Sequence, residues 1–389
     1  MKYYIIAGEA SGDLHGSNLI REIRKKDQAA LIRGWGGALM ENAGAQIVKN
    51  YRDLAFMGFT EVARNLPTIF RNIRFCKTDI LNFQPDAIIF IDYPGFNLRI
   101  AEWAHAKRFN TIYYISPQVW AWKENRVKKI RNCVDRMLVI LPFEKAFFQK
   151  WNYETDYVGH PLVEVIDRFK NSPKAQEPPE IYSPGKESTG TKLPIIACLP
   201  GSRKQEILKK LPVMLDASRY FGDYQFVVAE APGLDPEFYN EILKDYPQVG
   251  RVRNQTYSLL QYAQAACVTS GTATLETALF GVPEVVCYKG SAISYQIAKR
   301  LIKVKYISLV NLIMDRPIVK ELIQDEMNTE NIVQELRKLL SDEKARARLQ
   351  QDYQDLHELL SQGGNASEKA ADLIVNFMKN KKNQSQGQN

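Results

Sequence analysis

The fold of this chain is most clearly indicated by the stretch AACVTSGTATLE at residues 265–276. Its first five residues form an apolar run typical of a buried strand, and the residues from Thr272 to Phe280 have the apolar spacing of a helix. The stretch therefore predicts a strand, a tight turn at Ser270 and Gly271, and a helix. Free N–H groups at a helix start bind phosphate oxygens, and Glu276, about one turn further in, can accept hydrogen bonds from a ribose diol. A plain N-cap without a ligand is the alternative.

The sequence on both sides of this stretch repeats the same alternation of short apolar runs and helix-like segments. The expected strands are residues 2–7, 31–34, 86–91, 111–115, 136–140 and 157–158, then 195–199, 225–229, 265–269 and 283–287. Alternating units predict parallel sheets covered by helices on both faces, with ligand groups at the carboxyl ends of the strands. We therefore expect an α/β protein of two doubly wound, Rossmann-like domains that face each other across a cleft.

Composition places the boundaries of these domains. Residues 171–193 mix Pro and Gly with Lys, Glu and Ser, which indicates a linker or an exposed insertion between domains 1–170 and 194–378. Helical patterns fill the chain from about Asn328 to Met378, and residues 379–389 form a polar tail that we expect to be disordered.

Charge and cysteine usage limit the partners. A net charge of +8 favours anionic partners such as phosphorylated small molecules or an anionic membrane surface. No nucleic-acid-binding motif is present, so nucleic acid is not an expected partner. The five cysteines are scattered and the four histidines form no metal-ligand spacing, which predicts a cytoplasmic protein with neither disulfides nor a bound metal. No apolar run approaches the ~20 residues of a membrane span.

A second candidate phosphate loop opens the second domain. Gly201, Ser202 and Arg203 follow the expected strand 195–199 and precede a helix. Glycine lets the backbone approach a ligand closely, and a guanidinium can fork onto a phosphate. Arginine at a helix start opposes the helix dipole, so its presence favours a bound anion over a surface role.

Two turns of the first domain carry candidate chemistry. The first runs from Gly8 to Asp13 after the first strand, with Glu9, Ser11 and Gly12 between them. It lacks the dinucleotide fingerprint G-x-G-x-x-G, and an ordinary βα turn is the alternative. In the second, Asp92 follows a strongly apolar strand, where a carboxylate can act as general base or merely cap the turn.

Aromatic and basic residues suggest two further surfaces. Trp120 and Trp122 follow an expected strand, and they either line a wall for a sugar or acyl chain or close the core. An apolar stripe flanked by arginines and Lys77 suggests either a helix on an anionic membrane or an ordinary surface helix. The stripe consists of Leu66, Ile69, Phe70, Ile73 and Ile80, with Phe75 off it. Lys299, Arg300, Lys303 and Lys305 form a second, equally ambiguous basic stretch.

Taken together, these segments resemble the lipid-A-disaccharide synthase family, bacterial glycosyltransferases of GT-B architecture. The resemblance runs from Tyr4 to about Met327 and rests on an ordered series of motifs. They are AGEASGD (7–13), MGFTEV (57–62), IDYP (91–94), SPQVWAW (116–122), LPFEKAF (141–147), GHP (159–161), LPGSR (199–203) and SGTA (270–273).

The resemblance implies an inverting transfer of 2,3-diacylglucosamine from its UDP donor to the 6-hydroxyl of 2,3-diacylglucosamine 1-phosphate. It implies no metal or other cofactor, and an enzyme peripheral on the inner face of the cytoplasmic membrane. Asp92 matches the candidate base, and the Gly8–Asp13 turn would face the acceptor or the transferred sugar. The matching UDP-binding positions are Gly201, Ser202, Arg203, Ser270, Gly271, Thr272, Glu276 and Asn311.

The sequence departs from the family pattern at three places and leaves alternatives open. Gly95 stands where an Asp is common, Val310 replaces a usual Pro, and the connection from Asn171 to Gly190 is long. The alternatives are another GT-B enzyme acting on UDP-N-acetylglucosamine, namely a 2-epimerase or a lipid-linked transferase, and a non-catalytic membrane-surface protein of the same fold. A dehydrogenase is disfavoured because the glycine fingerprint is absent. The sequence does not predict an oligomeric state.

Overall fold

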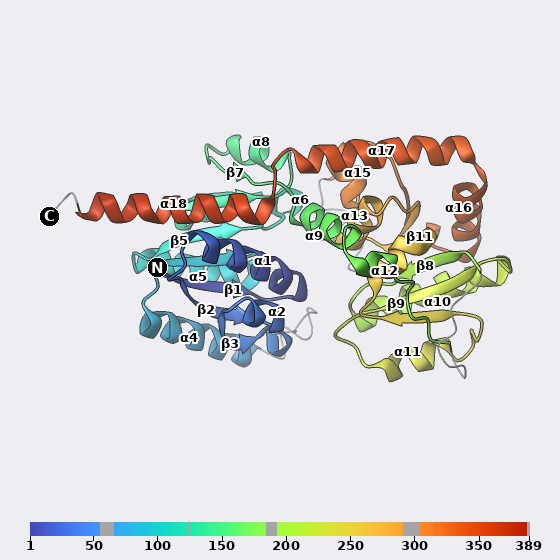
Figure 1. Cartoon of the computed structure of the whole chain (residues 1–389), viewed down its shortest axis with the longest axis horizontal. Coiled ribbons are helices and arrows are strands. Elements are labelled where there is room, and N and C mark those ends of the chain that lie inside the picture. Colours follow the sequence, from blue (N-terminus) through green and yellow to red (C-terminus); the bar gives the residue numbers. More distant parts are fainter. Residues whose placement is uncertain (55–65, 123, 184–192, 291–303, 387–389) are drawn as a thin grey trace. The chain divides into compact units, whose positions relative to one another are not determined.

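The computed structural model describes residues 1–54, 66–122, 124–183, 193–290 and 304–386 (Figure 1). The chain forms two compact units, Met1–Pro161 with Ser361–Asn389, and Leu162–Leu360. Each unit contains one parallel sheet, as the alternating sequence pattern predicted. The motif at 57–62 and the basic residues Lys299, Arg300 and Lys303 lie outside the described residues.

The first unit is built on a seven-stranded sheet of order β3-β2-β1-β4-β5-β6-β7. Its strands are β1 (Lys2–Ala7), β2 (Leu31–Gly36), β3 (Gln46–Asn50), β4 (Ala87–Ile91), β5 (Asn110–Tyr114), β6 (Arg136–Val139) and β7 (Asp156–Tyr157). All five residues of β4 are buried, as expected for a central strand covered on both faces. Strand order runs outward in both directions from β1 and β4, so the winding reverses between these two strands.

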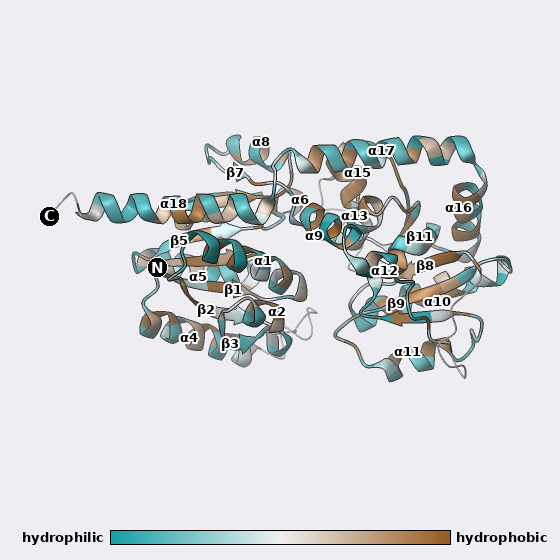
Figure 2. Ribbon diagram, viewed as in Figure 1, coloured by the Kyte–Doolittle hydropathy of each residue, from teal (hydrophilic) through white to brown (hydrophobic). Residues whose placement is uncertain are grey.

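Helices cover both faces of this sheet. They are α1 (Ala10–Lys26), α2 (Ala38–Asn42), α4 (Leu66–Phe83), α5 (Pro94–Ala106), α6 (Val119–Trp122), α7 (Arg126–Cys133), α8 (Glu144–Gln149) and α18 (Ala366–Gln386), with a short 3-10 turn at Tyr51–Leu54. Side chains alternate along β1, so that Tyr3 and Ile5 pack with α1 and α18, whereas Tyr4 and Ile6 pack with α4, α5 and α7. Figure 2 shows the apolar residues concentrated in the strands.

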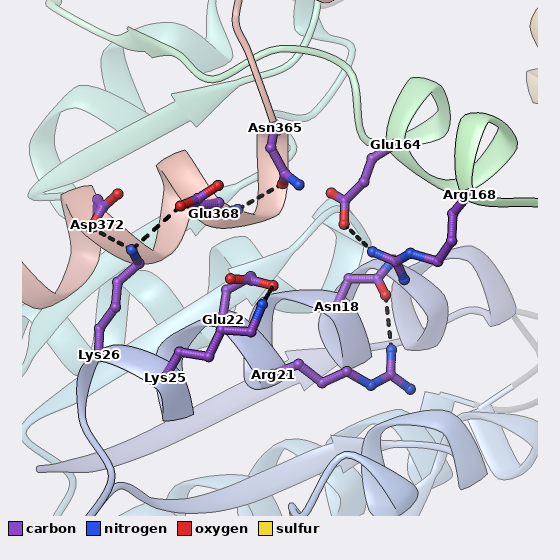
Figure 3. A network of polar contacts seen from close by, with 10 residues as sticks. All are labelled: Asn18, Arg21, Glu22, Lys25, Lys26, Glu164, Arg168, Asn365, Glu368 and Asp372. Carbon is purple, nitrogen blue, oxygen red and sulfur yellow. Dashed lines mark hydrogen bonds and ion pairs between the residues drawn. The ribbon is translucent and has the colours of Figure 1, made fainter. Parts of the chain in front are cut away.

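The C-terminal helix α18 belongs to the first unit, which corrects the predicted domain of residues 194–378. Ala370, Ile374 and Met378 are buried in one cluster with apolar residues of α1. At the end of α1, the Nζ atom of Lys26 lies 2.8 Å from Asp372 and 3.9 Å from Glu368 (Figure 3). The helix also continues to Gln386, so most of the tail expected to be disordered from residue 379 is helical.

The second unit has a six-stranded sheet of order β10-β9-β8-β11-β12-β13. Its strands are β8 (Ile195–Leu199), β9 (Gln225–Glu230), β10 (Gly250–Arg253), β11 (Ala263–Thr269), β12 (Glu284–Tyr288) and β13 (Lys320–Ile323). The chain winds outward in both directions from β8 and β11, so the reversal of winding lies between them. At the sheet edge, Tyr182 forms an antiparallel bridge with Arg251 of β10, which attaches this part of the predicted linker to the second unit.

The helices of the second unit again form two layers. They are α9 (Pro161–Lys170), α10 (Lys204–Ala217), α11 (Pro236–Leu243), α12 (Thr256–Tyr262), α13 (Thr272–Leu279), α15 (Leu309–Met314), α16 (Thr329–Ser341) and α17 (Glu343–Ser361), with 3-10 turns at Pro173–Gln176, Ser218–Tyr220 and Gln324–Glu326. One layer consists of α10, α11 and α16, and α12 packs on the opposite face. Because α9 lies in this unit, the boundary falls near Pro161, not at residue 170 as predicted.

Candidate active site

In the first unit, the reversal of winding brings two loops together at the carboxyl ends of β1 and β4. Ala7 pairs with Ile91 at the ends of these strands, so Gly8 and Asp92 begin neighbouring loops. A Cβ atom at Gly8 would lie 2.3 Å from the ring of Tyr93, so only glycine fits between the two loops. In doubly wound sheets, ligands bind at such points, which places Glu9 and Asp92 where the sequence predicted them.

Asp92 is held in a strained turn. Both Asp92 (φ 42°) and Tyr93 (φ 49°) adopt left-handed conformations that residues with a side chain rarely take. Two buried side chains hold the turn through the carbonyl oxygen of Asp92, which accepts hydrogen bonds from the hydroxyl of Tyr113 (2.6 Å) and from Nδ2 of Asn97 (2.8 Å). Strain maintained in this way is typical of functional positions.

The surroundings of Asp92 raise the pKa of its carboxyl group. Burial raises the pKa of Asp92 to about 7, and the nearby carboxylates of Glu9 and Glu144 act in the same direction. A carboxyl group with this pKa can both accept and hold a proton near neutrality. The geometry therefore suits a general base, and the carboxylate also accepts a hydrogen bond from the backbone of Tyr93, as the capping alternative expects.

The residues of the Gly8–Asp13 motif take different positions from those expected. Helix α1 begins at Ala10, so Ser11, Gly12 and Asp13 lie in its first turns and not in a loop. Ser11 is exposed, whereas Gly12 packs against Ala7. The carboxylate of Asp13 accepts three backbone N–H groups at the start of α2, from Gly37 (2.7 Å), Leu39 (3.2 Å) and Met40 (3.1 Å). Its oxygens therefore stabilise α2.

Trp120 is mostly packed. Its side chain is 8% exposed, and its Nε1 donates a hydrogen bond to Glu144 Oε1 at 3.1 Å. Glu144 is itself buried and also accepts hydrogen bonds from Ser116 and from the backbone of Leu141. Glu144 lies within the LPFEKAF motif but is not among the predicted site residues. The side chain of Trp122 lies outside the described residues.

In the second unit, the corresponding reversal point joins the loops after β8 and β11. Val268 pairs with Leu199, and a Cβ atom at Gly201 (φ 102°) would be 3.4 Å from Thr269, so the two loops are in close contact. Gly271 (φ 150°) has no atom of the described residues within 4 Å of the position of a Cβ. Within the described part of the chain, the turn therefore leaves space for a ligand where the sequence predicted phosphate binding.

Two helix N-termini lie at this reversal point. Helix α10 begins after Arg203 and helix α13 after Gly271, and neither N-cap residue forms a side-chain capping hydrogen bond, since glycine has no side chain and a guanidinium cannot accept one. Uncapped N–H groups carry partial positive charge and bind anions. Ser202 and Thr272 are exposed beside them, and Ser270 donates its hydroxyl hydrogen to the carbonyl of Ile307 at 2.7 Å. The arrangement can hold the oxygens of a diphosphate.

Glu276 lies one turn into α13, as predicted. Its Oε1 accepts a hydrogen bond from the hydroxyl of Tyr257 at 3.1 Å. Burial raises the pKa of Glu276 to about 7, and the bond from Tyr257 opposes this shift. A partly desolvated carboxylate next to an anion-binding helix start can accept hydrogen bonds from sugar hydroxyls.

Asn311 supports the site from behind. Its side chain is 1% exposed and makes four hydrogen bonds, to Val319 O, Glu321 Oε1, and the backbone N–H groups of Ile318 and Val319. Glu321 in turn accepts from the backbone of Ile307, whose carbonyl receives the hydroxyl of Ser270. Asn311 is thus connected to Ser270 through two intermediates, and its predicted place near UDP remains a prediction. Glu321 is not among the residues predicted from the sequence.

A cavity of about 350 Å³ continues the carboxyl edge of this sheet beyond β8. Its lining includes the ends of β9 and β10, where Glu230 forms ion pairs with Arg251 (3.0 Å) and Arg253 (2.9 Å). In the part of the chain that the structure describes, no group of three His, Cys, Asp or Glu side chains is arranged to hold a metal ion. The same part contains no helix with the length and hydropathy of a membrane span.

Comparisons with known proteins give the family of the chain and its fold. The family model for lipid-A-disaccharide synthetase matches residues 3–375. A lipid-A-disaccharide synthase of Syntrophus aciditrophicus is 39% identical over 96% of this chain and 97% of its own length. Among solved structures, a glycotransferase of kitacinnamycin has a TM-score of 0.64 at 14% identity, covering 96% of this chain and 98% of its own.

A UDP-GlcNAc 2-epimerase of Neisseria meningitidis has a TM-score of 0.63 at 12% identity, covering 98% of this chain and 100% of its own. At these identities the two solved structures support the fold, which is of GT-B type, and do not decide between transferase and epimerase. The family model and the curated relative decide that question. The chain belongs to the lipid-A-disaccharide synthetase family and is a glycosyltransferase of lipid A biosynthesis.

Proposed function

We propose that this chain transfers 2,3-diacylglucosamine from its UDP donor to the 6-hydroxyl of 2,3-diacylglucosamine 1-phosphate, with inversion at the anomeric carbon. The products are the β-1,6-linked disaccharide 1-phosphate and UDP. The observation that carries the proposal is the chemistry of the two reversal points, a carboxyl group with a raised pKa in one unit and uncapped helix N-termini beside Arg203 in the other. Family membership supplies the substrate class.

In this mechanism Asp92 removes the proton from the acceptor 6-hydroxyl as its oxygen attacks the anomeric carbon. The bond from that carbon to the diphosphate oxygen breaks, and UDP leaves with both bonding electrons. Arg203, the hydroxyls of Ser202, Ser270 and Thr272, and the amides around Gly201 and Gly271 stabilise the charge on the leaving diphosphate. Glu276 binds the ribose, and Asn311 acts through the Ser270 loop.

Two further proposals concern the acceptor side of the site and the absence of a cofactor. Glu9, Ser11 and the turn at Gly8 would lie on the side of the acceptor or the transferred sugar. Arg203 and the helix N-termini supply the positive charge that a divalent metal provides in other transferases, so we propose a reaction without metal or other cofactor.

The direct test is to incubate the purified protein with UDP-2,3-diacylglucosamine and 2,3-diacylglucosamine 1-phosphate and to analyse the products by mass spectrometry. The expected result is one disaccharide monophosphate for each UDP released. Release of UDP without a disaccharide, or epimerisation of the donor sugar, would contradict the proposal.

We also propose that helix α4 docks the enzyme on an anionic membrane surface at the cytoplasmic side. The predicted apolar stripe divides in the structure: Ile80 is buried, whereas Phe70 is 61% exposed. Phe75 and Leu81 are also exposed, at 44% and 42%. The basic residues Arg71, Arg74 and Lys77 lie on the same helix. Apolar side chains among arginines and lysines are the features of a helix that lies on an anionic leaflet.

Flotation with liposomes tests this surface. The variant Phe70→Ser/Phe75→Ser is expected to lose most binding to vesicles that contain anionic lipid. The matched control is Leu208→Ser on α10, which removes a comparably exposed side chain (54%) from the second unit. Equal binding by the wild type and the double variant would contradict docking through α4.

A further inference from the structure

The second unit contains a buried lysine on helix α10, which begins at the proposed diphosphate site. Lys210 on α10 has a side chain that is only 2% exposed, although it follows the exposed Lys209. Its neighbours on the helix, Ile207 and Leu211, belong to the apolar core of the unit. Lysine is almost never buried to this degree without a partner, because its ammonium group loses hydration.

The partner of Lys210 is Glu206, one turn earlier on the same helix. The Nζ of Lys210 donates a hydrogen bond to Glu206 Oε2 at 3.4 Å. The other oxygen, Oε1, accepts one from Arg203 at 3.2 Å. Glu206 therefore bridges a buried lysine and the exposed arginine that begins the helix. Its Oε2 also lies 3.5 Å from the position of a Cβ at Gly201, directly behind the phosphate loop.

The charges of Arg203, Glu206 and Lys210 together determine how this cluster acts on an anionic ligand. A single carboxylate next to Arg203 would cancel the positive charge that the diphosphate needs. With Lys210 on its other oxygen, the three side chains together carry a net positive charge. Burial lowers the pKa of Lys210, and the carboxylate of Glu206 opposes that shift. Because Lys210 is enclosed, it cannot contact the ligand as Arg203 can.

We propose that Lys210 is a positioning residue of the diphosphate site, which balances Glu206 and so keeps that carboxylate from neutralising Arg203. The inference rests on the proposed function, since it takes Arg203 to bind the diphosphate of the donor. It adds a residue that makes no contact with the nucleotide and acts through a bridging carboxylate.

The test measures UDP binding by titration calorimetry on the full chain. Lys210→Met replaces the ammonium by an apolar group of similar length, and we expect UDP to bind about tenfold more weakly, the effect of one charge-assisted interaction. The matched control is Lys209→Met, which removes the same charge from the exposed neighbour and is expected to leave binding within about twofold of wild type. Thermal unfolding of each variant confirms that it is folded.

Rescue separates positioning from simple packing. In Glu206→Gln/Lys210→Met the uncompensated carboxylate is gone, so UDP binding is expected to return to that of Glu206→Gln alone. In Arg203→Met/Lys210→Met the second substitution is expected to add nothing to the first. Wild-type affinity in Lys210→Met, or a loss that Glu206→Gln does not repair, would overturn the inference. If instead Arg203→Met binds UDP like wild type, the proposed diphosphate site itself is wrong.

Discussion

The two units share a topology but differ in the electrostatics of their reversal points. In the first unit, the loops after β1 and β4 present Glu9 and Asp92, and a left-handed turn holds the second of these carboxyl groups. In the second, the loops after β8 and β11 present Arg203, open glycine backbone and two uncapped helix N-termini. The same winding thus places carboxyl groups at one reversal point and positive charge at the other, which suits the proposed base and the proposed diphosphate site.

The largest effect is expected from removing the base. Asp92→Asn keeps the shape of the turn but cannot accept a proton at neutral pH, so turnover is expected to fall by about 10²–10⁴-fold. The assay is formation of the disaccharide monophosphate under substrate saturation. Turnover within threefold of wild type would remove Asp92 as the base.

A smaller effect is expected from replacing Glu276, at the carboxyl end of the second sheet. Burial raises the pKa of Glu276 to about 7, so its folded form binds a proton more tightly than the unfolded chain does. Its contribution to stability is therefore greatest below the unfolded pKa and is lost as the pH rises towards 7. At pH 8, Glu276→Gln is expected to raise the free energy of unfolding by about 1–3 kcal/mol and to weaken UDP binding several-fold.

Glu284 provides the matched control for this variant. It begins β12 at the opposite edge of the same sheet, is 1% exposed, and burial raises its pKa well above the usual value. Glu284→Gln is expected to stabilise the protein in denaturant unfolding without changing UDP affinity. Equal weakening of UDP binding by both variants would show that Glu276 has no specific part in the nucleotide site.

The smallest effect concerns Gly95, where the family commonly has an aspartate. A Cβ at this position has no atom of the described residues within 4 Å, so these residues leave room for the first carbon of an aspartate side chain. Wild-type kcat/KM is expected to rise with pH through about 7, because Asp92 must lose its proton to act. A new carboxylate nearby disfavours that ionisation and should move the acidic limb upward by less than about one pH unit. An unchanged limb would place residue 95 too far from Asp92 to influence it.

Local patterns identified the inner strands of both sheets and the loops that begin each half of the site, but missed three strands at the sheet edges, β3, β10 and β13. Residues 87–91 and 265–268 are continuous apolar runs, and Asp92 and Ser270 follow within two residues of them, so their places at the carboxyl ends could be predicted. The docking of α18 on α1 could not, because apolar spacing identifies a helix but not the unit on which it packs. Helix α1 begins at Ala10, inside the segment Gly8–Asp13 that was expected to be a turn, since packing of Gly12 and Gly16 against the sheet overrides their low helix propensity.

Burial of single polar side chains was also beyond local patterns. Lys209 and Lys210 are adjacent residues of the same type, yet Lys209 is exposed and Lys210 is buried beside Glu206. Trp120 is only 8% exposed and donates a hydrogen bond to Glu144, which is distant in sequence. These outcomes depend on which elements meet in space, and the spacing within one segment does not contain that information.

The central claim is that the first unit supplies the base and the second binds the diphosphate. It is tested most directly by titrating UDP into the wild type, Asp92→Asn and Arg203→Met. The account predicts that Asp92→Asn binds UDP within about twofold of wild type, whereas Arg203→Met binds it about 10- to 100-fold more weakly. Equal loss of affinity in the two variants, or full affinity in Arg203→Met, would contradict it.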